Sequence, residues 1–351
     1  MSDPLMIYGA TGYTGQLIAS EAKALGVRPM LCGRNESKLA AMAERLGFEY
    51  RVAQLSDSVI LDKVLSDVNV VLHAAGPFSE TSRPMVDACL RTGTHYLDIA
   101  GEVEVVEELA QRHRAARRRG IMIMPGVGFD VVPSDCLAAH VAGRLPGARR
   151  LIFGLKGLRF LTRASAKTLV EHAVIGVQVR RNGVLTSVVP GALQRSFDYG
   201  EGAHLSFAVS WGDVASAYYT TGIPNIEVYF ANLPSLQAML LATRYFGRLL
   251  GSGPLQAWFK AHADFLPEGP SAEERASTHV VIVAEAEDAD GQRASSRMVT
   301  PEAYTCTGML APAIARRVLK GDLEVGFQTP GRVYGADYVL SFPGVSRHDV
   351  D

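Results

Sequence analysis

The chain has 351 residues, of which 48% are hydrophobic and 20% are charged, so it has room for two domains and wholesale disorder is excluded. Its 35 basic and 36 acidic residues leave a formal net charge of -1, and no global positive field exists to hold nucleic acid. The four cysteines are scattered without C-x-x-C spacing. This spacing predicts reduced thiols in a cytoplasmic protein, with neither a disulfide frame nor a metal site.

No uninterrupted apolar stretch is long enough to span a bilayer. The nearest, 233–250, is interrupted by Arg244 and Arg248 and predicts an amphipathic helix that is buried, forms a lid or dimer face, or touches a membrane surface. A strand-like run begins at Leu5, so we expect no signal peptide before the fold. We expect a cytoplasmic homodimer that acts on a small-molecule or acyl substrate.

The first 125 residues alternate strand-like and helix-like runs. Apolar strands are predicted at 5–8, 29–32, 49–52, 68–74, 95–98 and 121–124. Helical spacing is found at 13–25, 36–46, 58–65, 84–91 and 103–119. Strands that alternate with helices predict an α/β domain over residues 1–125, with a Rossmann-type, doubly wound parallel sheet.

The pattern changes after residue 126. A helix is predicted at 132–142, a strand at 151–155, a loop at 267–277 and a last helix at 301–319. Asn182-Gly183 and Asp290-Gly291 are typical hairpin turns, the second between strands at 280–286 and 297–299. We expect a second, α+β domain for substrate and dimer contacts over residues 126–300, and a segment 301–351 that packs back on the first domain.

A glycine-rich loop, GATGYTG, joins the first predicted strand to the first predicted helix. Gly9 allows a tight turn, Gly12 lets a pyrophosphate approach the backbone, and Gly15 allows close packing of helix on sheet. The helix N-terminus then offers N–H groups and a positive dipole end to the phosphates. The alternative is a glycine-rich turn without a ligand. The predicted cofactor contacts of this loop are Gly9, Thr11, Gly12, Tyr13, Thr14 and Gly15.

The end of the second strand indicates which nucleotide binds. NAD-type sites place a carboxylate there for the ribose 2′-hydroxyl, whereas this chain has Arg34. A guanidinium suits a 2′-phosphate by charge and by stacking on adenine, and Ser37 and Lys38 follow in the next turn. These residues favour NADP(H), although solvated surface cations would give the same pattern.

Small residues follow the fourth strand and would let a cofactor cross the strand ends at the switch point of the sheet. They are Ala74, Ala75, Gly76 and Pro77. An ordinary loop is the alternative interpretation of the last two.

The motifs GATGYTG, AAGPF, GTHYLDIAGE (Gly93 to Glu102) and PGVGFDVVPSD (Pro125 to Asp135) together resemble the saccharopine dehydrogenase-like oxidoreductases, and among them the trans-acting enoyl reductases of bacteria. The resemblance extends along the chain to GFQTPGRVYG at Gly326 to Gly335. It implies an NADP-dependent enzyme that reduces a conjugated C=C (enoyl) or a C=N (imine) bond by hydride transfer. The alternative is a catalytically inactive NADP(H)-binding regulatory or interaction protein.

Hydride transfer mostly needs positioning and well-placed charge, so its catalytic residues can be few. Tyr96, Asp98 and Glu102 lie at the fifth strand end, where Tyr96 would donate a proton and a carboxylate would orient it. Capping of the next helix is the alternative role for Glu102. After the sixth strand, Asp130 is a further catalytic candidate, with a hinge or helix cap as its alternative.

The loop after the sixth strand also supplies cofactor candidates, since Gly128 allows unusual backbone angles and Phe129 would pack on the nicotinamide. We expect His73 to be buried in the sheet. Lys167 and Arg275 are candidate contacts to an anionic substrate, and His172 is a candidate cleft residue.

Overall fold

The computed structural model describes residues 4–158, 176–245 except 235, 236, 239 and 242, and 267–350. The chain forms two compact units, which are described separately here. Unit 1 comprises Met1–Val132 and Tyr304–Val333, and unit 2 comprises Pro133–Ala303 and Tyr334–Asp351. The segment 301–351, which was predicted to pack as one on the first domain, is therefore divided between both units.

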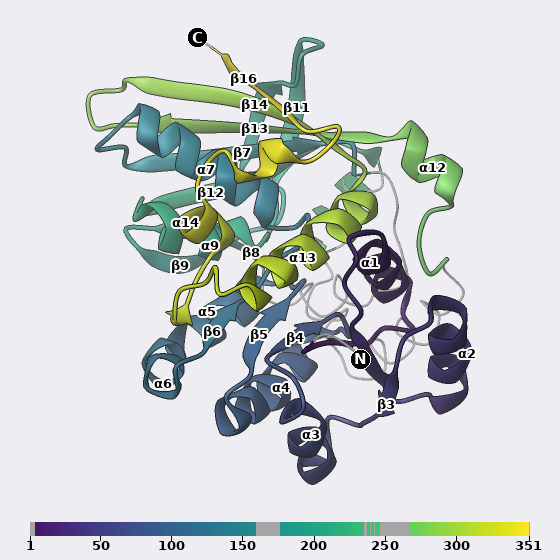
Figure 1. The fold of residues 1–351 in the computed structure, drawn as a ribbon. Coiled ribbons are helices and arrows are strands. Elements are labelled where there is room, and N and C mark those ends of the chain that lie inside the picture. The colour runs from purple at the N-terminus through teal and green to yellow at the C-terminus, as the bar shows by residue number, and fades with distance from the viewer. Residues whose placement is uncertain are drawn as a thin grey trace. The chain divides into compact units, whose positions relative to one another are not determined.

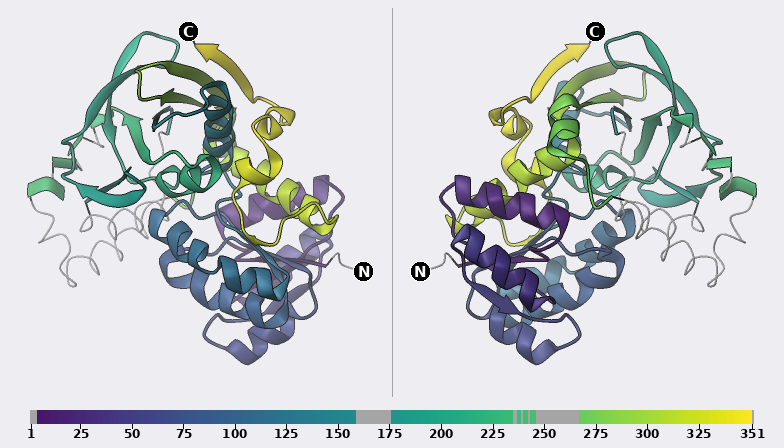
Figure 2. Two further views of the ribbon diagram at one scale, coloured as in Figure 1. Left: turned by 90° about the vertical axis from the view of Figure 1, so that its left-hand side faces the viewer. Right: turned by 90° about the vertical axis from the view of Figure 1, so that its right-hand side faces the viewer.

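Unit 1 is a parallel, doubly wound sheet with helices on both faces (Figures 1 and 2). Its strand order is β15-β6-β5-β4-β1-β2-β3, and every pairing is parallel. The strands are β1 (Leu5–Tyr8), β2 (Met30–Gly33), β3 (Tyr50–Val52), β4 (Val70–His73), β5 (His95–Asp98), β6 (Met122–Met124) and β15 (Gly326–Phe327). The helices are α1 (Tyr13–Ala24), α2 (Glu36–Leu46), α3 (Ser58–Leu65), α4 (Phe78–Thr92), α5 (Val103–Gln111), α6 (His113–Arg119), α13 (Ala303–Leu319) and α14 (Pro330–Tyr334). This confirms the predicted Rossmann-type fold.

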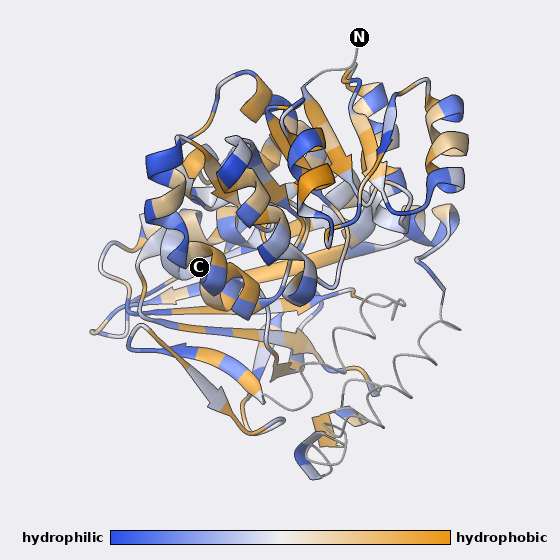
Figure 3. Cartoon of the chain, turned by 90° about the horizontal axis from the view of Figure 1, so that it is seen from below, coloured by the Kyte–Doolittle hydropathy of each residue, from blue (hydrophilic) through white to orange (hydrophobic). Residues whose placement is uncertain are grey.

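The central strands are apolar throughout because helices cover both of their faces. All four residues of β1, β2 and β4 are buried, and Figure 3 shows the same concentration of hydrophobic residues in the strands of this unit. Local signals set the helix ends. In α2, the Asn35 side chain accepts a hydrogen bond from the Lys38 N–H, and Gly47 ends the helix in the left-handed conformation.

Three expectations about unit 1 were wrong in detail. Helix α4 begins at Phe78, before the predicted start at Pro84. Its first turn is polar and has no apolar periodicity, so no pattern in the sequence indicates a helix there. The predicted helix 103–119 is two helices, since Arg112 bonds back to Leu109 in a tighter turn. Strand β15 was missed, because a two-residue strand has no recognisable pattern.

Unit 2 contains a nine-stranded mixed sheet. Its main order is β10-β11-β12-β7-β13-β14-β16, and β8 pairs with β12 and β9. The strands are β7 (Arg150–Lys156), β8 (Val177–Arg181), β9 (Val184–Val188), β10 (Gln194–Asp198), β11 (Ala203–Ala208), β12 (Asn225–Ala231), β13 (His279–Glu287), β14 (Arg293–Pro301) and β16 (Ser346–Val350). The helical elements are α7 (Val132–Arg144), α9 (Asp213–Thr221), α12 (Ala272–Ser277) and the 3-10 turn η1 (Tyr338–Ser341). The predicted α+β class of the second domain is confirmed.

Turn chemistry explains both predicted hairpins of unit 2. Asn182 and Gly183 have φ values of 48° and 81°, as a two-residue hairpin turn of the primed type requires. The Asp288 side chain accepts hydrogen bonds from Asp290 and Gln292 N–H and closes the other hairpin. The expected loop 267–277 instead contains α12, because Ser271 and Glu274 form a capping box that the sequence analysis overlooked.

Some expectations fall outside the described residues. These include Lys167, His172 and residues 246–250 of the amphipathic stretch. Arg275 is described, and its guanidinium donates to the Pro270 carbonyl at 3.1 Å. Within the part of the chain that the structure describes, no helix has the length and apolarity needed to cross a bilayer.

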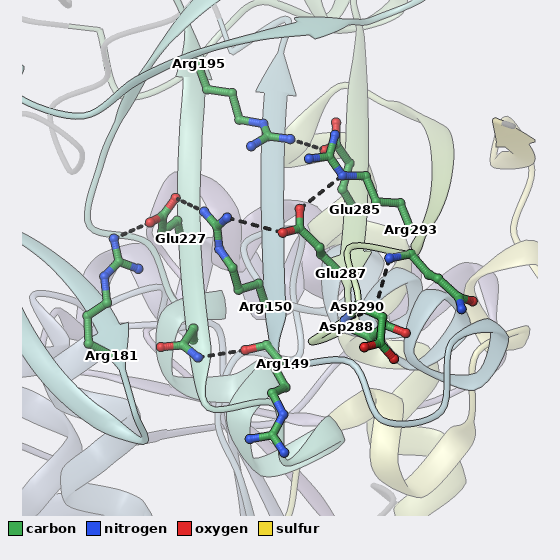
Figure 4. A network of polar contacts seen from close by, with 12 residues as sticks. Arg149, Arg150, Arg181, Arg195, Glu227, Glu285, Glu287, Asp288, Asp290 and Arg293 are labelled. Atoms are coloured by element: carbon green, nitrogen blue, oxygen red, sulfur yellow. Dashed lines mark hydrogen bonds and ion pairs between the residues drawn. The ribbon is translucent and has the colours of Figure 1, made fainter.

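A ladder of alternating charges crosses the sheet of unit 2 (Figure 4). It runs through Arg181 of β8, Glu227 of β12, Arg150 of β7, Glu287 of β13 and Arg293 of β14. Each side chain contacts a partner of opposite sign on the next strand. The Arg150 guanidinium lies 4.0 Å from Glu227 and 3.6 Å from Glu287, and Arg293 lies 3.0 Å from Glu287.

Glu227 is the most buried member of this ladder, with a side chain only 6% exposed. It contacts Arg181 and Arg150 and also accepts the Tyr229 hydroxyl at 2.6 Å. Loss of its charge therefore leaves several polar groups without a partner in a partly buried place.

We expect Glu227→Gln to lower the free energy of unfolding by about 2–3 kcal/mol, somewhat less than loss of a fully buried pair. The matched control is Glu201→Gln, since Glu201 pairs with Lys156 but is 71% exposed. That change should cost much less, because solvent screens an exposed ion pair. Urea unfolding followed by circular dichroism measures both, and equal costs for the two variants would contradict the role given to Glu227.

Candidate functional site

The strand order of unit 1 reverses between β1 and β4, and the loops that follow these two strands touch. Gly9 follows β1 with a φ of +83°, and a Cβ built on it would lie 2.7 Å from the Ala75 Cβ. Only glycine fits this contact. The predicted cofactor residues Gly9, Ala74 and Ala75 are thus brought together at the switch point, where doubly wound sheets bind nucleotides.

The other two glycines of the loop have different reasons. A Cβ on Gly15 would lie 2.3 Å from the Gly9 carbonyl oxygen, so Gly15 is required by the packing of α1 against the loop. A Cβ on Gly12 would meet only the Gly9 oxygen, at an ordinary 3.4 Å, and Gly12 is exposed. No protein contact demands glycine at position 12. A ligand that approaches the backbone there does, and this fits a pyrophosphate.

Helix α1 begins at Tyr13, and no side chain caps its N-terminus. The loop before it is held by a hydrogen bond from Gln16 Nε2 to the Thr11 carbonyl at 3.1 Å. Thr11, Tyr13 and Thr14 are half-buried around this end, and the Tyr13 ring packs edge-on against Tyr304. The helix dipole and backbone N–H groups suit a diphosphate.

Arg34 lies directly after β2, is exposed, and makes no hydrogen bond or ion pair with the described residues. Lys38 is exposed in the first turn of α2, where a cation is unfavourable for the helix dipole. The Ser37 hydroxyl donates to Asn35 Oδ1 at 2.9 Å and so belongs to the cap of α2. Among the described residues, the Arg34 and Lys38 side chains have no ionic partner. Both cations are therefore available to an anion near the end of β2.

The loop after β4 is held by the helix that follows it. The Thr81 hydroxyl lies 2.7 Å from the Ala75 carbonyl and 2.9 Å from the Pro77 carbonyl. Gly76 is exposed and Ala74, Ala75 and Pro77 are half-buried, so this loop presents backbone rather than side chains at the edge of the sheet. This arrangement supports cofactor contact.

Tyr96 and Asp98, two predicted catalytic residues, are both fully buried. The Tyr96 hydroxyl donates to Asp98 Oδ2 at 2.7 Å and lies 3.2 Å from His73 Nδ1. Burial raises the pKa of Asp98 to about 6, against the lowering effect of two backbone N–H groups. Burial also holds the pKa of Tyr96 well above its usual value. His73 is buried in the sheet, as expected.

Of Asp98 and Asp130, which both lie near the C-terminal ends of these strands, Asp130 has the pKa closer to neutral. Burial, and then the nearby charge of Glu102, raise its pKa to about 7. Both carboxyl groups border Gly101: Glu102 Oε2 accepts the Gly101 N–H at 3.0 Å, and a Cβ on Gly101 would lie 2.6 Å from Asp130 Oδ2. The Glu102 side chain makes no cap bond to α5. A carboxyl that holds a proton near neutral pH can act as a general acid.

Gly128 and Phe129 have reasons within the fold. A Cβ on Gly128 would lie 2.9 Å from Thr307 of α13, and the Phe129 N–H donates to the Thr307 hydroxyl at 3.0 Å. The Phe129 side chain is buried. Their predicted cofactor contacts remain predictions, and the structure adds Thr307 as the residue that fixes this loop. Its role could not be read from the sequence, since 178 positions separate it from Phe129.

The geometry defines a Rossmann-type dinucleotide-binding unit, and comparison with known proteins is consistent with it. Residues 5–124 match the family described as the saccharopine dehydrogenase NADP binding domain. The resemblance to the saccharopine dehydrogenase-like oxidoreductases and the NADP assignment are confirmed through this domain. Among the described residues, no cluster of side chains suits a metal ion.

Relatives match part of the chain. A saccharopine dehydrogenase-like oxidoreductase of Bos taurus is 28% identical over 163 residues, which is 41% of this chain and 38% of that protein. A trans-acting enoyl reductase of Mycobacterium leprae is 35% identical over 142 residues, which is 37% of this chain and 33% of that protein. The matched region thus spans little more than a third of each relative.

A solved structure shares the fold along the chain. Apo saccharopine dehydrogenase (L-Glu forming) of Saccharomyces cerevisiae matches with a TM-score of 0.66 at 13% identity, over 99% of both chains. At this identity the likeness concerns the fold alone.

The two glycines of the loop give a test of the phosphate site. We expect Gly12→Ala to keep the free energy of unfolding within about 1 kcal/mol of the wild type and to weaken NADPH binding at least tenfold, because the methyl group has space in the protein but obstructs the phosphates. Gly15→Ala, the matched control, should lower stability by about 1–3 kcal/mol through overpacking. Fluorescence titration and urea unfolding separate the effects, and unchanged affinity in Gly12→Ala would refute the site.

The pKa of Asp130 predicts a pH dependence of stability. Its folded pKa of about 7 lies above the ordinary pKa of an aspartate. Between these two pKa values the folded chain binds more protons than the unfolded chain, so the free energy of unfolding falls as pH rises toward 7. Asp98, raised to about 6, acts in the same direction. We expect Asp130→Asn to be more stable relative to the wild type at pH 8 than at pH 5. Exposed Asp67→Asn should show no such trend, and parallel pH curves for Asp130→Asn and wild type would contradict this assignment.

Proposed function

We propose that this chain is an NADPH-dependent reductase that transfers a hydride to a conjugated C=C or a C=N bond. The observation that carries the proposal is the place of Asp130, whose carboxyl group borders Gly101 at the C-terminal ends of the strands, where the glycine loop also lies. Burial and the charge of Glu102 raise its pKa to about 7. A reduction of either kind leaves a basic carbon or nitrogen that must be protonated. A carboxyl that is partly protonated at neutral pH suits that task.

The residues of unit 1 divide the work. The glycine loop and the N-terminus of α1 would hold the diphosphate, and Arg34 with Lys38 would hold the 2′-phosphate. When bound, NADPH supplies a hydride to an electron-poor carbon. Asp130 would give its proton to the adjacent atom that takes up the electron pair, which is the α-carbon of an enoyl group or the nitrogen of an imine. Glu102 would keep that proton on Asp130 by its negative charge.

The relatives support two substrate classes. The name trans-acting enoyl reductase points to a conjugated C=C bond, and the resemblance to saccharopine enzymes points to a C=N bond. Enoyl thioesters of increasing chain length, and imines formed from an oxo acid and an amine, are the two panels to test with NADPH deuterated at C4. Deuterium in the product identifies the reduced bond. Tight NADPH binding without transfer to any member of either panel would favour the non-catalytic alternative.

Asp130→Asn tests the proton source once a substrate is found. We expect kcat to fall about 10²–10⁴-fold, the usual contribution of a general acid, with the NADPH dissociation constant within threefold of the wild type. The fall in rate above pH 7, where Asp130 would lose its proton, should disappear from the rate profile. Asp67→Asn is the charge-matched control. A variant at position 130 with wild-type kcat would remove Asp130 from the reaction.

Arg34→Ala tests the choice of nucleotide. A charge-assisted contact to the 2′-phosphate is worth about 1.5–3 kcal/mol, so NADPH affinity should fall about 10–100-fold while NADH affinity stays unchanged. Arg45→Ala removes the same charge from the other end of α2, where Arg45 is also exposed, and should change neither affinity. Equal losses for NADPH and NADH would show that Arg34 does not read the 2′-phosphate.

A further inference from the structure

A chain of buried hydrogen bonds joins three neighbouring strands of unit 1. His73, Tyr96 and Asp98 lie on β4 and β5 and have no exposed surface. The Tyr96 hydroxyl bonds to His73 Nδ1 and to Asp98 Oδ2, at 3.2 and 2.7 Å. Asp98 Oδ1 accepts two backbone N–H groups at 2.9 Å, those of Ala100 and Gly126.

The number of protons in this chain fixes their direction. Asp98 Oδ2 can only accept while the carboxyl is ionised, so Tyr96 gives its one hydroxyl proton to Asp98. The Tyr96 oxygen must then accept from His73, which places the proton of the neutral imidazole on Nδ1. Burial lowers the pKa of His73 to about 3, which keeps the ring neutral.

The other ring nitrogen, His73 Nε2, is then a bare acceptor. It is buried and has no hydrogen-bond partner. The rings of Tyr8, Phe78 and Tyr96 pack edge-on around the imidazole, with centroids 5.5, 5.3 and 6.1 Å away. Aromatic edges of this kind tolerate a lone pair better than an unbonded N–H, which favours the tautomer with its proton on Nδ1.

Each end of the chain of bonds leads into a loop of the candidate site. His73 directly precedes the loop of Ala74 to Pro77, Ala100 opens the loop that carries Glu102, and Gly126 opens the loop that carries Asp130. The Val127 N–H also donates to the Asp98 carbonyl at 2.7 Å. The Asp98 carboxylate therefore accepts hydrogen bonds from the loops after both β5 and β6. Tyr96 links this carboxylate to His73 at the end of β4.

We propose that Asp98 and Tyr96 are positioning residues that hold these three loops in register and set the tautomer of His73, and that neither gives a proton to the substrate. Both side chains are sealed from solvent, whereas the Asp130 side chain is half-buried. The inference deepens the proposed function, since the loops are those of the proposed site. Its main test needs neither NADPH nor a substrate.

The tautomer of His73 can be read by ¹⁵N NMR of histidine-labelled full-length chain, with His73→Asn to assign the signal. We expect the wild type to carry its proton on Nδ1. In Asp98→Asn the amide at position 98 no longer needs the Tyr96 proton, so Tyr96 donates to His73 and the proton moves to Nε2. In Tyr96→Phe the bias toward Nδ1 is lost. A proton on Nε2 in the wild type, or on Nδ1 alone in both variants, overturns the proposal.

Amide hydrogen exchange tests the hold on the loops. We expect the Ala100 and Gly126 N–H groups to exchange about tenfold faster in Asp98→Asn than in the wild type, because a neutral acceptor replaces a charged one. Tyr96→Phe keeps the carboxylate and should leave both rates within twofold. The control Thr94→Val removes another buried hydrogen bond, to the Leu65 carbonyl, away from these loops. If Thr94→Val raised both exchange rates as much as Asp98→Asn, positioning by Asp98 would be refuted.

The kinetic readout separates positioning from proton transfer. Tyr96→Phe has no hydroxyl, so a role as proton donor requires its kcat to fall about 10²-fold or more. We expect a loss of less than tenfold, with the fall in rate above pH 7 unmoved. If kcat of Tyr96→Phe fell as for a proton donor while the tautomers were as expected, the positioning role would be contradicted and the NADP site would stand. If no substrate were reduced at all, the proposed function would fail and the tautomer result would be unaffected.

Discussion

The absence of a side chain at Gly9 is the constraint on which the rest of unit 1 depends. Its backbone packs directly against Ala75, so the loops after β1 and β4 are in contact. Gly15 lets the N-terminal end of α1 pack against the same loop. A side chain at either position would force the loops apart. The contact keeps Gly12 at the surface, with space beside it that no protein atom requires. Helix dipole, open backbone and nearby cations then coincide at one edge of the sheet.

Much of unit 1 was predictable because each of its signals is local. A buried parallel strand is a short apolar run, a helix has its own period and caps, and the glycine loop joins one of each. The positions of Arg34 and of the residues after β4 followed from this order alone. The elements that were not predicted also have local signals, but these signals are weak. Strand β15 has two residues, β16 is a polar edge strand, and α12 depends on a capping box in a stretch rich in polar residues.

The chemistry at the strand ends was harder to predict, since it depends on which side chains are buried. Tyr96 and Asp98 have the residue types of a proton donor and its partner, yet both are enclosed. The Asp98 carboxylate accepts hydrogen bonds from Ala100 nearby and from Gly126, 28 positions away. Asp130 was an equal candidate in the sequence. It differs through the neighbourhood of Glu102 and Gly101, which no spacing rule reveals.

The path of the C-terminal region has a consequence for how the chain folds during synthesis. Strand β6 ends at Met124, but β15, its neighbour at the sheet edge, begins only at Gly326. The free edge of β6 must therefore wait until Gly326 has been synthesised. During that time it is open to pairing with another nascent copy. Helix α13, whose Thr307 holds the Phe129 loop, is also synthesised long after β6, so the nucleotide site is completed well after the first strands have emerged.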